Sequence, residues 1–128
     1  ALNNLWAWRF GNEGYRYIGR VEGLEELVNM YCNDTDDAAT EYLAGLSNLH
    51  KYNIWTTQIT DKSLDVLSGM DSLQQILLQK CNRLTDEGLA KLQRLPLLRS
   101  LSLQQCQGLT EKGIGVFGVD VQVNFQPA

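Results

Sequence analysis

The chain has 128 residues, of which 44% are hydrophobic and 20% charged, and its formal net charge is −4. These values indicate about one globular domain and argue against disorder. A net negative charge argues against a nucleic-acid binder, which needs a concentrated basic surface, and no apolar run approaches the roughly 18 residues that a membrane span needs. Residues 1–50 contain eight acids and three bases, and residues 51–128 contain seven acids and eight bases. This asymmetry fits either ordinary solvated faces or an acidic half that prefers a basic partner.

An apolar pattern recurs along the chain, and its copies start at Leu2, Leu24, Leu49, Leu73 and Leu98. The copy over 1–23 is degenerate, and the copy over 24–48 has a polar residue where later copies have leucine. The copies over 49–72, 73–97 and 98–118 are regular. The steps of 22, 25, 24 and 25 residues are typical of leucine-rich repeats. Residues 119–128, with alternating Val and Phe, are predicted to form a strand that caps the sheet edge.

Each copy changes its apolar period midway. Ile76 and Leu78 alternate as in a strand, whereas Leu89, Leu92 and Leu95 recur as on one face of a helix. Because neither element can bury its apolar side alone, the copies must stack around a shared core. We therefore expect an α/β fold, a leucine-rich repeat solenoid of about four strand–helix repeats with a curved parallel sheet and a C-terminal capping strand. The whole chain, 1–128, is predicted to be a single domain.

A threonine followed by an acid recurs at the strand–helix junctions. Thr60 and Thr85 each precede an aspartate just before helical periodicity begins, and Thr110 precedes a glutamate. A side-chain oxygen at this position can accept the unpaired amides of the first helical turn. These positions are therefore predicted to cap the helices.

Cysteines recur where each strand turns toward its helix, at Cys32, Cys81 and Cys106, and Thr57 is predicted to take this place in the copy over 49–72. An odd number of cysteines without a CxxC pair indicates neither a disulfide framework nor a zinc cluster. We expect these thiols to be unpaired and buried, each at the same position of its own repeat. The alternative is that they are reactive or bind a metal.

No catalytic constellation is expected in this chain. The stretch GIGVFG, residues 113–118, matches a nucleotide-binding pattern but lies in the helical half of a repeat, without the strand and helix context that such a loop needs. Asp61, Asp86 and Glu87 recur at helix starts, where capping explains them. The only histidine is His50. We therefore expect no enzyme, no metal, no cofactor and no small-molecule substrate.

The pattern LxxLxLxxCxxLTDxGLxxLxxLxx resembles the cysteine-containing class of leucine-rich repeats. That class is best known from the substrate-receptor domains of F-box proteins, and related copies are common in bacterial proteins. The family of mitochondrial ATP synthase coupling factor B also looks similar in size and repeat class. The resemblance covers nearly the whole chain and is strongest over 49–117. It implies a curved solenoid that binds proteins through the concave face of its sheet, and it implies no catalytic residue.

Side chains that alternate with the inward leucines are predicted to form columns on this concave face. The first column is Trp6, Val28, Asn53, Leu77 and Ser102, and the second is Trp8, Met30, Trp55, Gln79 and Gln104. The third column is Arg9, Tyr31, Thr56, Lys80 and Gln105. An aromatic patch on the first three strands has the composition of a protein interface, and its predicted binding residues are Trp6, Trp8, Arg9, Met30, Tyr31 and Trp55. The alternative is that the first copies are distorted, so that these rings pack inward or beneath a further N-terminal segment.

The expected function is that of a non-enzymatic interaction module or accessory subunit that binds a protein partner or a larger complex. The alternative is a substrate-recognition arm of an enzyme assembly such as an F-box-type ubiquitin ligase, and an F-box upstream in the full-length chain would separate the two. Unpaired inward thiols favour a reducing compartment, the cytoplasm or the mitochondrial matrix.

Overall fold

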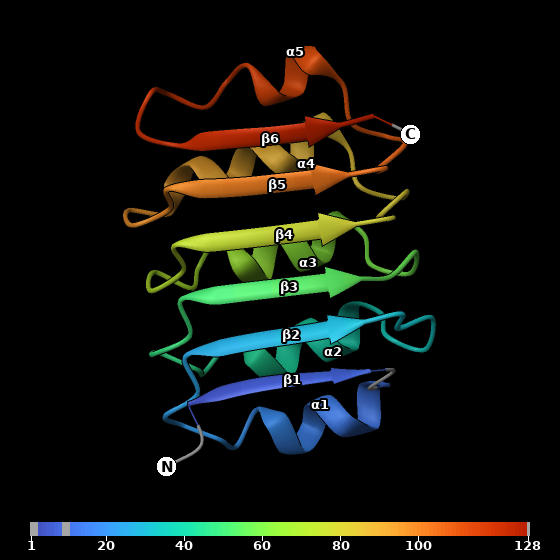
Figure 1. The fold of residues 1–128 in the computed structure, drawn as a ribbon, viewed down its shortest axis with the longest axis vertical. Coiled ribbons are helices and arrows are strands. Elements are labelled where there is room, and N and C mark those ends of the chain that lie inside the picture. The colour runs from blue at the N-terminus through green and yellow to red at the C-terminus, as the bar shows by residue number, and fades with distance from the viewer. Residues whose placement is uncertain (1–2, 9–10, 128) are drawn as a thin grey trace.

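The computed structural model describes residues 3–8 and 11–127, apart from the side chains of Ala7 and Trp8. Its six strands form one parallel sheet, and the strand order follows the chain order (Figure 1). The strands are β1 (Asn4–Trp8), β2 (Glu26–Met30), β3 (Lys51–Trp55), β4 (Gln75–Gln79), β5 (Ser100–Gln104) and β6 (Gln122–Gln126). The helical segments between them are α1 (Asn12–Ile18), α2 (Asp37–Leu43), α3 (Asp61–Leu67), α4 (Asp86–Leu89), the 3₁₀ helix η1 (Ala90–Arg94) and α5 (Glu111–Ile114).

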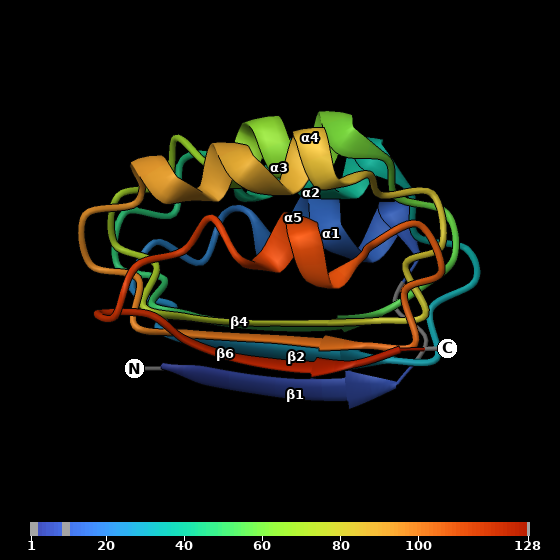
Figure 2. The ribbon, with the colours of Figure 1, turned by 90° about the horizontal axis from the view of Figure 1, so that it is seen from above.

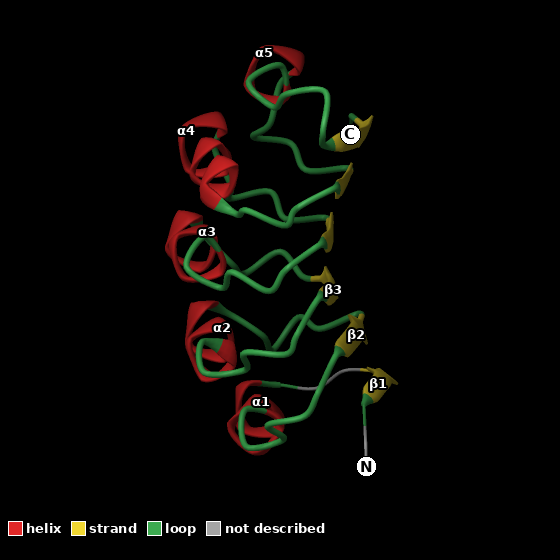
Figure 3. Ribbon diagram, turned by 90° about the vertical axis from the view of Figure 1, so that its left-hand side faces the viewer, coloured by secondary structure: helices red, strands yellow, loops and turns green. Residues whose placement is uncertain are grey.

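The protein therefore has an α/β fold in which strands and helices alternate. Figure 2 shows all the helices on one face of the sheet. Figure 3 shows that the stack bends, so that the face without helices is concave. Because parallel neighbours need a crossover, each helix returns the chain to the start of the next strand. The described part of the chain contains five strand–helix units followed by β6, because the degenerate first copy forms a unit, β1 and α1, in addition to the four expected repeats.

The core lies between the sheet and the helices. Leu78 of β4 pairs with Leu103 of β5, and both side chains are fully buried. Leu89 and Leu92 close the same core from the helical side. The predicted strand register and the predicted helical face are both confirmed at these positions.

The predicted helix caps are also present. Thr60, Thr85 and Thr110 are the N-cap residues of α3, α4 and α5, and each hydroxyl accepts a hydrogen bond from a backbone N–H of its own helix. Because α3, α4 and α5 are short, such caps satisfy a large share of their free amides.

The acid of one repeat also binds the cap of the next repeat, which sequence periodicity did not reveal. Asp61 accepts from the backbone N–H and the hydroxyl of Thr85, and Asp86 binds Thr110 in the same way. Asp37 accepts from the N–H and hydroxyl of Thr60. These bonds connect consecutive helix starts along the stack.

The polar residue in the second copy has a buried partner. Asn29 is fully buried at the position equivalent to Leu78, and its Nδ2 donates to the hydroxyl of Tyr15 at 3.0 Å. The Tyr15 hydroxyl lies 3.0 Å from that of Tyr52. Burial raises the pKa of both phenols, so they remain neutral hydrogen-bonding groups. A polar network thus replaces one leucine of the core.

The end of the chain differs in part from its prediction. The capping strand is present as β6, and Val121, Val123 and Phe125 pack against the core. Val119, however, is fully exposed and lies before the strand. The GIGVFG segment begins in α5 and continues into the connection to β6.

Candidate protein-binding surface

The strand register agrees with the first two predicted columns on the concave sheet face, although Val28 of the first column is buried. The strand pairing places one column in register across five strands, in the order Trp6, Val28, Asn53, Leu77 and Ser102. In the neighbouring column, Trp8 pairs with Met30, and Trp55 pairs with Gln79. Since the helices cover only the opposite face, this side of the sheet has no helix over it in the described part of the chain.

The predicted binding residues have different exposures. The side chain of Trp6 is 68% exposed and that of Tyr31 is 45% exposed. Met30 and Trp55 are half-buried. The backbone of Trp8 lies in β1, but its side chain is outside the described residues, as is the whole of Arg9.

The third predicted column is wrong at Thr56. This side chain is fully buried, and its hydroxyl donates to the carbonyl of Thr35 at 2.8 Å. It occupies the inward position that Cys32, Cys81 and Cys106 hold in their repeats, so Thr57, which is half-buried, is not the cysteine equivalent.

The physical reason is that the turn after β3 is one residue shorter than the turns after β2, β4 and β5. In the longer turns, the residue before each cysteine adopts a left-handed backbone conformation, with φ of 58° at Tyr31, 60° at Lys80 and 56° at Gln105. The turn after β3 lacks this residue, and its chain passes directly from Trp55 to the inward Thr56. The 24-residue step from Leu49 to Leu73 was the signal in the sequence.

The difference in turn length brings two rings together. The ring centroids of Tyr31 and Trp55 are 5.1 Å apart, and the planes are tilted by 48°. Tilted aromatic pairs at this separation are favourable. The two rings therefore pack together into one aromatic surface at the carboxyl end of the strands.

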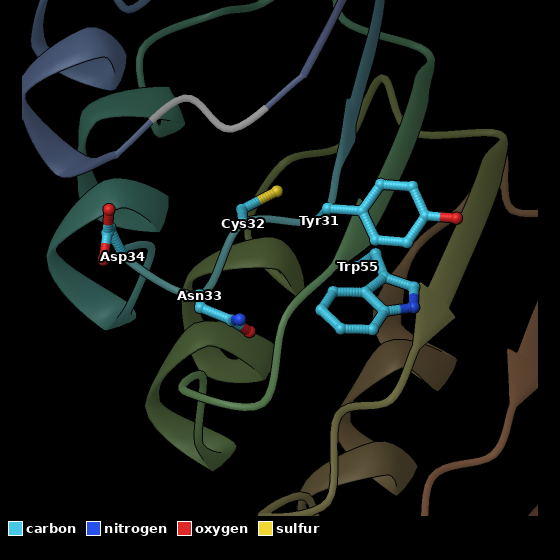
Figure 4. Close-up of a pocket in the computed structure, with 5 residues that line it drawn as sticks. All are labelled: Tyr31, Cys32, Asn33, Asp34 and Trp55. Atoms are coloured by element: carbon cyan, nitrogen blue, oxygen red, sulfur yellow. The ribbon is translucent and has the colours of Figure 1, made fainter.

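Next to this pair lies a pocket of about 360 Å³ (Figure 4). Its lining residues are Tyr31, Cys32, Asn33, Asp34 and Trp55. Figure 4 shows the Asn33 amide directed toward the indole and Asp34 at the opposite end. Burial raises the pKa of Cys32 to about 11, so this thiol is neutral near pH 7. Asn33 and Asp34 were not predicted as site residues, because the turn carries no apolar period.

A second aromatic contact involves Trp6, the middle residue of β1. The ammonium of Lys51 is 5.6 Å from the centroid of the Trp6 ring and 4.0 Å from a carboxylate oxygen of Glu26. The indole therefore contacts a cation from β3 across the sheet face. Lys51 was also not predicted as a site residue.

The three thiols are buried, as predicted, and none forms a disulfide. The hydrogen bond with Cys106, together with burial, raises the pKa of Cys81. The same bond lowers the pKa of Cys106, although burial acts in the opposite direction. The Cys106 thiol also contacts the carbonyl of Leu78. The thiols of Cys81 and Cys106 therefore take part in hydrogen bonds between neighbouring repeats.

Among residues 3–8 and 11–127, no group of three or more His, Cys, Asp or Glu side chains is arranged to hold a metal ion. In the same ranges, none of the helices has the length and apolar character required to cross a bilayer. Neither the models of known protein families nor the curated protein sequences give a match to this chain.

Proposed function

We propose that this chain is a leucine-rich repeat solenoid of the cysteine-containing class and that it acts as a non-enzymatic module or accessory subunit. In this proposal it binds a protein partner through the concave face of its sheet. The observation that carries the proposal is the gathering of aromatic side chains on the first three strands, on the face without helices. Trp6, Tyr31 and Trp55 supply large apolar surfaces with polar edges, which suits the centre of a protein interface.

The change from aromatic to polar side chains along the sheet supports the same proposal. The row that contains Trp55 continues with Gln79, Gln104 and Gln126 on the later strands. The partner is therefore expected to bind the early strands most tightly. Polar amides in the later strands can form the rim of such an interface.

The test compares two residues from one row of the sheet. A partner is captured with the immobilised protein from its natural source, identified by mass spectrometry and purified. Its dissociation constant is then measured for the wild type, Trp55→Ala and Gln104→Ala. Because a central aromatic contributes about 2 kcal/mol or more, Trp55→Ala should weaken binding at least about 30-fold. Gln104→Ala should change it less than about threefold.

Urea unfolding of both variants provides the control for folding. Trp55 is half-buried on the open face rather than in the core, so its replacement should leave the protein folded. Wild-type affinity in Trp55→Ala would contradict the proposal. An unfolded Trp55→Ala protein would equally contradict it, because the indole would then serve the fold.

A further inference from the structure

We propose that the pocket beside Tyr31 and Trp55 binds the cationic end of a lysine or arginine side chain supplied by the protein partner. This inference rests on the proposed function, since the pocket lies at one end of the proposed binding face. It adds the chemistry of the group that the partner must present.

The aromatic wall favours a cation. Tyr31 and Trp55 line the pocket with rings tilted by 48° at 5.1 Å. The face of an aromatic ring is negative, and tryptophan attracts ammonium and guanidinium groups most strongly. The sheet face already contains one such contact, between Lys51 and the ring of Trp6.

The charge of the lining points in the same direction. Asp34 carries the single formal charge among the five described lining residues, because Cys32 remains a neutral thiol. The carboxylate and the negative ring faces of these described residues therefore favour a cation over an anion. A wholly apolar ligand would remove water from Asn33 and Asp34 without replacing their hydrogen bonds. A cation with an apolar stem satisfies both the rings and the polar groups.

The pocket has room for the cationic end of a side chain. Its volume of about 360 Å³ is near the lower end of the range for ligand pockets, roughly 300 to 1,000 Å³. The acidic residues of the first half also favour a basic partner: residues 1–50 contain eight acids and three bases. Long-range attraction of this kind raises the rate of association with a basic surface.

The test uses matched small probes, so it does not depend on knowing the partner. Nα-acetylarginine amide and Nα-acetyllysine amide are titrated into the ¹⁵N-labelled protein, with Nα-acetylcitrulline amide and Nα-acetylnorleucine amide as their neutral counterparts. The indole N–H signal of Trp55, assigned with Trp55→Phe, and the backbone signal of Asn33 report binding. The cationic probes should bind at least about fivefold more tightly than their neutral counterparts, which corresponds to roughly 1 kcal/mol.

Two variants test the aromatic rings and the carboxylate of the pocket separately. Trp55→Ala should abolish the shift of the Asn33 signal. Asp34→Asn keeps the size of an exposed side chain. It should weaken the binding of the cationic probes about threefold, and the effect should be smaller in 1 M salt. Asp71→Asn, which removes another exposed acid outside the pocket, serves as the matched control and should leave binding unchanged.

The inference is overturned if citrulline binds as tightly as arginine and norleucine as tightly as lysine, or if neither cationic probe shifts the two signals. Equal binding by Asp34→Asn and the wild type in low salt would also overturn it. These outcomes remain separate from the proposed function. If Trp55→Ala loses the partner while no cationic probe binds, the partner uses the face without a basic anchor. If the probes bind while Trp55→Ala retains the partner, the pocket stands and the proposed function fails.

Discussion

The carboxylate of Asp61 accepts two hydrogen bonds from Thr85 in the next repeat, one from the backbone N–H at 2.9 Å and one from the hydroxyl at 2.6 Å. The same hydroxyl accepts from the N–H of Gly88 in its own helix at 3.2 Å. Thr85 therefore caps its helix and attaches that helix to the preceding repeat. This double use explains why a threonine and an acid recur together along the chain.

Gly88→Ala should destabilise the protein, although alanine favours helices. A Cβ at Gly88 would overlap the side chain of Asp61, which cannot move without losing its bonds to Thr85. We expect a loss of about 1 to 3 kcal/mol in the free energy of unfolding, measured in urea. Gly45→Ala, where a Cβ would meet no atom within 4 Å, should change it by less than about 1 kcal/mol. In the Asp61→Ala background, the penalty at Gly88 should largely disappear; an unchanged penalty would show that the overlap is not its cause.

Asp37 should make stability depend on pH in the acid range. Burial alone would raise the pKa of this carboxyl group, but hydrogen bonds from Ser63 and Thr60 outweigh it and lower the pKa below its ordinary value of 3.8. The stabilisation is therefore present in full above about pH 5 and is lost as pH falls through the lowered pKa.

The measurement for Asp37 is urea unfolding of the wild type and Asp37→Asn from pH 7 to pH 2.5. At pH 7 the variant should lose about 1 kcal/mol, a modest value because the carboxylate is partly exposed. The difference should shrink as the pH approaches 3. Asp120→Asn, an exposed position, is the control, and a gap that stays constant with pH would contradict the assignment.

Leu78 and Leu77 test the register with adjacent residues on opposite faces. Leu78 is fully buried in the core, whereas Leu77 is half-buried on the open face. Leu78→Ala should cost about 2 to 5 kcal/mol in unfolding free energy, and Leu77→Ala less than about 1.5 kcal/mol. Similar losses at both positions would argue against the strand pairing.

Cysteine labelling tests whether Thr56 or Thr57 occupies the position that a cysteine has in three other repeats. A thiol introduced by Thr56→Cys would lie at the buried position and should react in the folded protein as slowly as Cys32, whose raised pKa of about 11 leaves little thiolate. A thiol from Thr57→Cys should react at least about tenfold faster with a disulfide reagent at pH 7.5. The reverse order of rates would restore Thr57 as the cysteine equivalent.

The apolar framework of this protein could be predicted from the spacing of its residues. The spacing of Leu78 and Leu103 predicts the strand register because a shift of one residue would turn every core side chain to solvent. The alternation of residues along a strand also places Trp6 outside. Cys32, Cys81 and Cys106 were predicted to lie inside for a different reason, because each recurs at the turn of its own repeat. These predictions rest on patterns that recur along the chain and can be read directly from its sequence.

The partners of the polar groups, in contrast, depend on how the repeats pack against one another. Asp61 and Thr85 are 24 residues apart, and their contact exists only because consecutive repeats stack. Asn29 is acceptable in the core because the Tyr15 hydroxyl happens to lie beside it. The pocket beside Trp55 arises where a turn with a left-handed residue at Tyr31 adjoins a turn without one. Apolar periodicity describes which side of an element is buried, whereas hydrogen bonds and pockets depend on the positions of atoms from different repeats.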